Sequence, residues 1–82
     1  MFTLKQLTIF DAVARLGSVS EAADSLAMTQ PAASMALQQL ESILETELFV
    51  SVQKRMSLTP QGKVLQPLAR SMLNSAQEIK LQ

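Results

Sequence analysis

Residues 18–41, SVSEAADSLAMTQPAASMALQQLE, constrain the fold more than any other stretch of the chain. Apolar residues recur there at helical spacing on both sides of a short polar joint. The helix before the joint is expected to end at about Ala27. Its residues Ala22 and Ala23 are small enough to let a second helix approach closely, as two helices that cross steeply around a tight turn require. The stretch therefore predicts a helix-turn-helix made of two short helices.

Capping residues predict where each helix of this motif begins. Ser18 followed by Glu21 is the pattern of a capping box, in which the serine accepts a free backbone N–H and the glutamate bonds back to the N–H of the cap. Thr29 followed by Pro31 predicts the start of the second helix, because proline lacks an N–H that the first turn does not need. The predicted buried face of that helix comprises Ala33, Leu37, Leu40 and Leu44, with Ala36 and Ile43 beside them.

The opposite face of the helix that begins after Thr29 is polar, small-sided and uncharged. At about 100° per residue it carries Pro31, Ser34, Met35, Gln38 and Ser42. Base edges of DNA are read by hydrogen bonds and methyl contacts rather than by charge. Gln30 and Gln38 can pair with adenine, and Pro31, Ala32 and Met35 can meet thymine methyl groups. A simpler interpretation exists for some of these positions: Gln38, with Gln39 and Ser42, can be an ordinary solvated position, and Met35 can be a packing or dimer contact.

A helix precedes the motif, and a hairpin follows it. Residues 4–16 have helical spacing, and Gly17 ends that helix because it can take the left-handed conformation. The apolar stripe of this helix comprises Leu4, Leu7, Phe10, Val13 and Ala14. Residues 48–58 alternate with period two and predict a small β-hairpin. Its expected tip is Gln53, Lys54 and Arg55.

Thr59 and Pro60 then start a fourth helix by the same logic of a cap followed by proline. Pro67 cannot donate to the carbonyl of Lys63, so it should kink or delay the helix. The stripe is core by default, but in an isolated domain its exposed part should drive self-association. The residues expected to mediate dimerisation are Leu65, Leu68, Met72, Ala76 and Ile79, and Val64 and Leu73 widen their stripe.

Together these elements predict a mainly α-helical fold. It is a winged helix-turn-helix, with a three-helix core and a small two-stranded β wing, followed by a long linker or dimerisation helix. We place the winged helix-turn-helix at residues 1–59 and the linker helix at residues 60–82. In such folds the second helix of the motif enters the major groove of DNA, led by its N-terminal end, where free N–H groups and the helix dipole attract phosphate.

The net charge of zero hides an uneven distribution. Residues 1–50 carry a charge of −4, from two basic and six acidic residues, and residues 51–82 carry +4, from five basic and one acidic residue. The asymmetry either marks a polar interface or is chance scatter on a solvated surface. Attraction to phosphate must come from the wing, through Lys54 and Arg55, and from the fourth helix.

Composition excludes several other kinds of site. The chain has no cysteine and no histidine, which excludes disulfides, thiolate nucleophiles and zinc sites built on those residues. The remaining polar side chains form no pair with a catalytic context, so we expect no enzyme, no metal site and no cofactor. No segment approaches the roughly 20 apolar residues of a membrane span, and residues 1–17 make a poor signal-peptide core. We expect a cytoplasmic protein.

From about Leu4 to Ile79 the chain resembles the DNA-binding domain of LysR-type transcriptional regulators. The resemblance rests on the runs TQPAAS, LQQLE, ELF and LTPQG, which occur in the order and spacing of that family. The N-terminal pattern of the family is matched by Leu7, Phe10, Val13, Ala14, Gly17, Ser18, Ala22, Ala23 and Leu26.

The resemblance implies a bacterial, sequence-specific transcription regulator that binds double-stranded DNA. Family members bind interrupted palindromes as homodimers, through antiparallel linker helices, or as dimers of dimers. The usual C-terminal effector-sensing domain does not fit in 82 residues, so we expect a fragment, with any small-molecule inducer bound only by the absent domain. Carried over by position, base and groove contacts fall on Gln30, Pro31, Ser34 and Met35, and the wing contact in the minor groove falls on Lys54. The full set of expected DNA-binding residues is Thr29, Gln30, Pro31, Ser34, Met35, Gln38, Lys54 and Arg55.

The chain departs from the family where charge is usual. Met35 and Ser51 replace common arginines, and Glu45 replaces the glycine that ends the recognition helix. We therefore expect a DNA site richer in A·T, or weaker and more salt-sensitive binding. A protein-interaction module on the same scaffold is the alternative. Zero net charge and the apolar stripe favour that alternative, which predicts dimerisation without DNA affinity.

Overall fold

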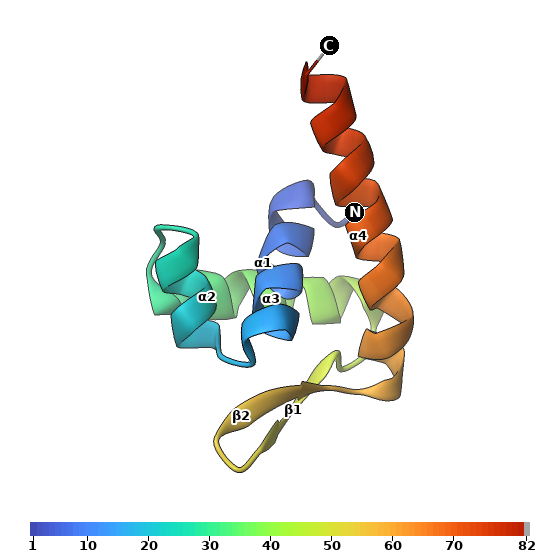
Figure 1. The fold of residues 1–82 in the computed structure, drawn as a ribbon. Helices are drawn as coiled ribbons and strands as arrows, with labels where there is room; N and C mark the ends of the chain where they lie inside the picture. The colour runs from blue at the N-terminus through green and yellow to red at the C-terminus, as the bar shows by residue number, and fades with distance from the viewer. Residues whose placement is uncertain (82) are drawn as a thin grey trace.

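A computed structural model describes residues 1–81. It has the predicted fold, with three helices, a two-stranded antiparallel hairpin and a long last helix. Figure 1 shows α1 in the centre of the molecule, the hairpin projecting at one end, and α4 running beside α1 and beyond it. The elements are α1 Leu4–Leu16, α2 Val19–Ser25, α3 Gln30–Leu44, β1 Phe49–Val52, β2 Arg55–Leu58 and α4 Pro60–Leu81.

The core is aliphatic and is organised around α1, because α2, α3 and α4 all pack against that helix. Its largest fully buried side chains are Phe10, Leu7, Ile9, Leu40, Leu48 and Val13. Burial of α1 is wider than the predicted stripe, since Ile9 and Ala12 are also buried. The prediction that Leu4 belongs to the buried stripe is wrong. Leu4 lies in the first turn, where the neighbouring elements leave it exposed.

Local capping sets the helix boundaries largely as predicted. Gly17 ends α1 with φ +70°, in the left-handed region. The Thr29 hydroxyl accepts the N–H of Ala32 at 3.2 Å at the start of α3. The Thr59 hydroxyl accepts the N–H of Gly62 at 3.0 Å at the start of α4. Three of the predicted boundaries therefore rest on side-chain and backbone chemistry within a few residues of the helix ends.

The capping box predicted at the start of α2 is half right. The Ser18 hydroxyl accepts the N–H of Glu21 at 3.1 Å, but the Glu21 carboxylate bonds to Arg55 in β2 instead of returning to the cap. A complete capping box occurs at the start of α1, where Thr3 and Gln6 bond reciprocally. The sequence contains that pattern, and the prediction passed over it.

The hairpin pairs Phe49 with Leu58 at its base and Val52 with Arg55 at its end. Only Gln53 and Lys54 therefore form the turn, and the prediction that Arg55 lies at the tip is wrong by one residue. Both turn residues have positive φ, +50° and +66°, the conformation of a two-residue hairpin turn that glycine and asparagine usually occupy. The hairpin is anchored at its other end, where Phe49 packs on Phe10 with ring centroids 5.4 Å apart.

Helix α4 begins at Pro60 and continues through Pro67, so the predicted delay of the helix is wrong. Pro67 is exposed on the side away from the core. The N-terminal half of α4 belongs to the packed body, since Ala69 is fully buried and Arg70 bonds to Asp11 of α1 at 2.9 Å. The boundary placed at residue 60 stays a prediction, and the packing continues across it.

Candidate nucleic-acid interface

The N-terminal half of α3 forms an exposed, uncharged surface. Gln30, Pro31 and Ala32 are exposed in its first turn, Met35 is 60% exposed, and Gln38 extends the surface by one more turn. Ser34 is only partly exposed. The structure therefore brings six of the eight expected DNA-binding residues together on α3, counting the exposed cap Thr29.

This surface is held outward by the opposite face of α3. Ala33, Leu37 and Leu40 are buried, and α3 packs on both α1 and α2 through that side. Ile43, which was predicted to lie beside the buried face, is 41% exposed in the last turn of α3. The rigid packing of the inner face fixes where Gln30, Pro31 and Met35 point.

The N-terminus of α3 offers less free backbone than the sequence suggests. Pro31 has no N–H, the Thr29 hydroxyl accepts that of Ala32, and the carbonyl of Thr29 accepts that of Ala33. Of the N–H groups in the first turn, that of Gln30 is the one left for an external acceptor within the described part of the chain. A phosphate bound there would accept one backbone N–H at the positive end of the helix dipole.

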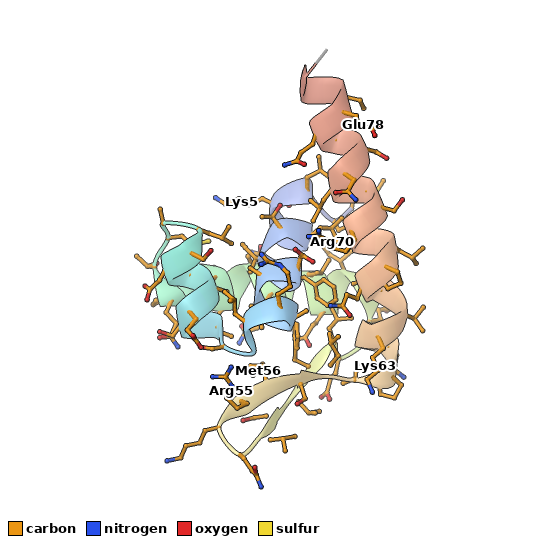
Figure 2. The ribbon with its side chains drawn as sticks, viewed as in Figure 1. Lys5, Arg55, Met56, Lys63, Arg70 and Glu78 are labelled. Atoms are coloured by element: carbon orange, nitrogen blue, oxygen red, sulfur yellow. The ribbon has the colours of Figure 1, made fainter. Side chains whose placement is uncertain are left out.

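The wing, formed by β1, β2 and the turn between them, carries two basic residues, Lys54 and Arg55, which differ in their contacts. Lys54 is exposed in the turn itself. Arg55 is directed back to the body, as Figure 2 shows, where its Nη2 donates to the carbonyl of Leu16 at 2.6 Å and its Nη1 to Glu21 at 3.3 Å. The two residues, equivalent in the sequence pattern, are therefore not equivalent in space.

The three acidic residues near the end of α3 each have a local structural role. Glu41 is half-buried, and its carboxylate accepts the backbone N–H of Leu48 at 2.7 Å, which ties α3 to the residue before β1. Glu45 caps the helix with φ +53°, the left-handed conformation that the family glycine would take. Glu47 is exposed, and its carbonyl accepts the hydroxyl of Thr59 at 2.6 Å. The negative end of α3 thus lies away from the uncharged surface.

Lys5 is a candidate that the sequence did not single out. It lines two shallow grooves of about 310 Å³ each, one with Met28, Met35 and Gln39 and one with Ala27 at the turn between α2 and α3. Its amine is therefore the basic group of α1 nearest to the exposed surface of α3. Only the packing of α1 against the motif reveals this, because Lys5 is about 25 residues from α3 in sequence.

The five residues predicted to mediate dimerisation differ in exposure. Leu68, Met72 and Ile79 are exposed, and Val64 joins them at 67% exposure. Leu65 and Ala76 are half-buried, and Leu65 packs against the core together with Leu73. The dimerisation set stays a prediction, and Leu65 is the member of it that also packs against the core.

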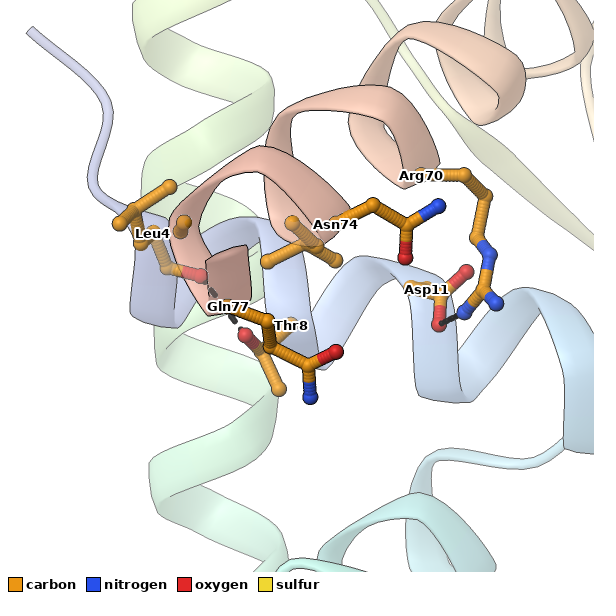
Figure 3. Close-up of a pocket in the computed structure, with 8 residues that line it drawn as sticks. Leu4, Thr8, Asp11, Arg70, Asn74 and Gln77 are labelled. Carbon is orange, nitrogen blue, oxygen red and sulfur yellow. Dashed lines mark hydrogen bonds and ion pairs between the residues drawn. The ribbon is translucent and has the colours of Figure 1, made fainter. Parts of the chain in front are cut away.

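A groove of about 420 Å³ separates the distal part of α4 from the start of α1 (Figure 3). Asp11 lies at its end with a side chain only 6% exposed, and one carboxylate oxygen accepts bonds from both Arg15, at 3.1 Å, and Arg70, at 2.9 Å. The groove lies on a different side of α1 from the uncharged surface of α3.

The described residues contain no group of three acidic, histidine or cysteine side chains placed to hold a metal ion. Nor does any helix within residues 1–81 have the length and apolarity to cross a membrane.

Comparison with known proteins gives a consistent result. Residues 4–63 match the family model described as bacterial regulatory helix-turn-helix protein, lysR family. The transcriptional regulator YeiE of Escherichia coli K12 is 41% identical over 78 residues, which are 95% of this chain and 27% of YeiE. This chain thus spans about a quarter of that relative.

Solved structures are similar over nearly the whole chain. A mutant of OxyR from Corynebacterium glutamicum superposes with a TM-score of 0.94 at 34% identity, over 96% of this chain and 26% of that one. The structure of a CbnR_DBD–DNA complex superposes with a TM-score of 0.91 at 30% identity, over 96% of this chain and 91% of that one.

Proposed function

Because the chain belongs to the lysR family of bacterial regulatory helix-turn-helix proteins, we propose that it is the part of a transcriptional regulator that binds a specific duplex DNA sequence. The observation that carries the proposal is the exposed, uncharged N-terminal half of α3, held outward by a buried opposite face beside a basic wing. The similarity to a domain solved with DNA supports it.

In the proposed complex the N-terminal end of α3 enters the major groove. Gln30 and Gln38 pair with base edges, Ser34 donates or accepts a hydrogen bond, and Pro31 and Met35 contact thymine methyl groups. The N–H of Gln30 binds a backbone phosphate at the start of the helix. The wing approaches the neighbouring minor groove, and Lys54 provides its positive charge.

We propose further that the regulator binds as a homodimer. The exposed apolar residues of α4 would pair with the same residues of a second copy, and two half-sites would then be held at a fixed spacing. Because this chain spans about a quarter of YeiE, the inducer, any assembly into a tetramer and the control of genes are assigned to the remainder of such a regulator. A regulator of this kind acts in the cytoplasm and needs no cofactor on this domain.

Selection of bound duplexes from a random DNA pool tests the proposal. The purified chain should enrich one sequence family and bind its members at least about a thousandfold more tightly than unrelated duplexes at the same salt concentration. Replacement of Gln30 by Ala should relax the preference at one base position and cost about 1–3 kcal/mol of binding free energy for the preferred duplex.

A specific alternative is favoured by the exposed apolar residues Val64, Leu68, Met72 and Ile79. If the domain were only a protein-interaction module, it would dimerise and yet shift no duplex in a gel. The two functions are thus separated by one measurement: a chain that sediments as a dimer but enriches no sequence would contradict DNA binding.

A further inference from the structure

We infer that Arg55 is a positioning residue, which fixes the wing relative to the helix-turn-helix, and that Lys54 is the wing side chain that meets DNA. The inference rests on the proposed function and deepens it, because it assigns different roles to two adjacent basic residues. It replaces the expectation from sequence that both residues contact DNA.

Three bonds tie the start of β2 to the end of α1, the turn that follows it and the first part of α2. Arg55 donates to the carbonyl of Leu16 at 2.6 Å and to the carboxylate of Glu21 at 3.3 Å. The next residue, Met56, donates its backbone N–H to the carbonyl of Gly17 at 3.0 Å. Two successive residues of the wing are therefore bound to a segment that leads directly into the helix-turn-helix.

The seat of the guanidinium group is specific. Leu16 is the last residue of α1, and its carbonyl lies at the negative end of the helix dipole, where a cation is favoured. Gly17 has no side chain to fill the space, whereas a Cβ there would come within 2.9 Å of Nη2 of Arg55. An exposed ion pair such as that with Glu21 contributes little alone, so the charge-assisted bond to the carbonyl is the main contact.

The wing needs such a tether because its own structure is weak. A two-stranded hairpin is marginal in water without further packing. Here the turn residues Gln53 and Lys54 both hold positive φ without being glycine or asparagine. The pair Val52–Arg55 closes that turn, so the bonds made by Arg55 hold the backbone from which Lys54 projects.

The ion pairs of the two basic residues also support different roles for Arg55 and Lys54. The Arg55 guanidinium already faces a carboxylate and a backbone carbonyl, so much of its attraction for phosphate is met within the chain. In the described structure Lys54 forms no ion pair and is exposed beyond the last strand pair. A helix-turn-helix and its wing must reach two adjacent grooves at once, and the tether keeps Lys54 at a constant distance from α3.

The test is a double-mutant cycle on the salt dependence of DNA binding, with the 82-residue chain and the duplex that this chain selects. Lys54→Ala should make the negative slope of log K against log salt shallower by about one, because one phosphate contact is lost. Arg55→Ala should weaken binding roughly three- to tenfold, because Lys54 then loses its fixed position. In the double variant the negative slope of log K against log salt should also become shallower by about one, which is the same change as in Lys54→Ala alone. A loss of about two in the double variant would show that Arg55 contacts phosphate itself, and would overturn the inference.

A measurement without DNA separates this inference from the proposed function. Hydrogen exchange of the Met56 amide should become several-fold faster in Arg55→Ala and stay unchanged in Lys54→Ala. Glu21→Gln removes the charge of one partner of Arg55 and leaves the sequence of the wing unchanged, so it should give a smaller increase in the exchange rate of the Met56 amide. Unchanged exchange of Met56 in both Arg55→Ala and Glu21→Gln would overturn the inference. Failure of the unaltered chain to select any duplex would instead overturn the proposed function.

Discussion

Gly62, in the first turn of α4, lies against the backbone carbonyl of Leu48. A Cβ at this position would collide with that oxygen and come within 2.9 Å of the Leu58 side chain. Alanine is favoured over glycine in helices by roughly 1 kcal/mol, yet we expect Gly62→Ala to lower the free energy of unfolding by about 1–3 kcal/mol, because a backbone oxygen cannot move aside cheaply. Thermal unfolding followed by circular dichroism measures the change. Gln61→Ala, at an exposed neighbour, is the control and should be nearly neutral; a more stable Gly62→Ala chain would contradict the prediction.

Glu45 ends α3 in the left-handed conformation, with φ +53°. Glycine takes this conformation without a steric penalty, whereas other residues pay roughly 1–2 kcal/mol. We expect Glu45→Gly to raise the free energy of unfolding by up to about 1 kcal/mol, which is a rise in Tm of about 4–8 °C per kcal/mol for a domain of this size. Glu45→Ala keeps the Cβ, so it should give no comparable gain. Equal gains from both variants would show that loss of the charge, rather than relief of the backbone, is responsible.

The roles of residues whose interaction partners lie within a few positions in the sequence were predictable. The roles of residues whose partners lie far away in the sequence were not. The caps Thr29 and Thr59 and the terminator Gly17 follow from local chemistry, and the structure confirms them. The role of Arg55 depends on the carbonyl of Leu16, 39 residues away, and that of Asp11 on Arg70, 59 residues away. No pattern in one sequence links such pairs, because their contact exists only once the helices have packed.

At the scale of elements, α4 shows what apolar periodicity can and cannot predict. The spacing correctly indicated a long amphipathic helix. Its apolar face is wide enough, however, to serve two purposes, with Ala69 and Leu73 packed in the body and Leu68 and Met72 exposed beside them. Periodicity does not separate these halves, since which half faces α1 depends on how the helix is rotated in the fold.

The exposed half of α4 carries a prediction about assembly. Leu68→Glu and Met72→Glu, alone and together, should convert a dimer into monomers, because each places a charge in an apolar contact while leaving the core side of the helix intact. Sedimentation measures the state, and affinity for the selected duplex should fall in parallel. Gln77→Glu adds one charge at an exposed position outside the apolar residues and should leave the dimer unchanged. A Leu68→Glu and Met72→Glu chain that remains dimeric would show that the interface lies elsewhere.

At the scale of the whole molecule, the order of the elements was enough to predict the architecture, and the order of cap, proline and apolar residues placed the candidate site on α3. The charge distribution was the less certain clue, because net charge says nothing about which residues are already paired. In the structure Arg15 and Arg70 bind Asp11, and Arg55 binds Glu21, so three of the six basic residues whose side chains the structure describes are engaged within the chain. The positive charge of the second half of the chain is therefore smaller in effect than its formal value.

This limited positive charge and the uncharged surface of α3 lead to a prediction about the DNA sequence. Met35 replaces the arginine that would pair with guanine, and Gln30 and Gln38 suit adenine. We expect the duplexes selected by the chain to have half-sites rich in A·T. Introduction of arginine by Met35→Arg should shift selection toward guanine at one position and raise affinity at a given salt concentration, because it adds a positive charge at the surface that faces the DNA. A guanine-rich core selected by the unaltered chain would contradict the expectation.

The joint between α1 and α4 has a mechanical consequence. Ala69 is fully buried, and the bonds of Asp11 to Arg70 and Arg15 close the contact. A helix of 22 residues is about 33 Å long, and its N-terminal half is fixed to the helix-turn-helix. A rotation imposed near Ile79 would therefore turn the helix-turn-helix as a rigid body. The separation between two such domains on DNA would then change without any bend at Pro60.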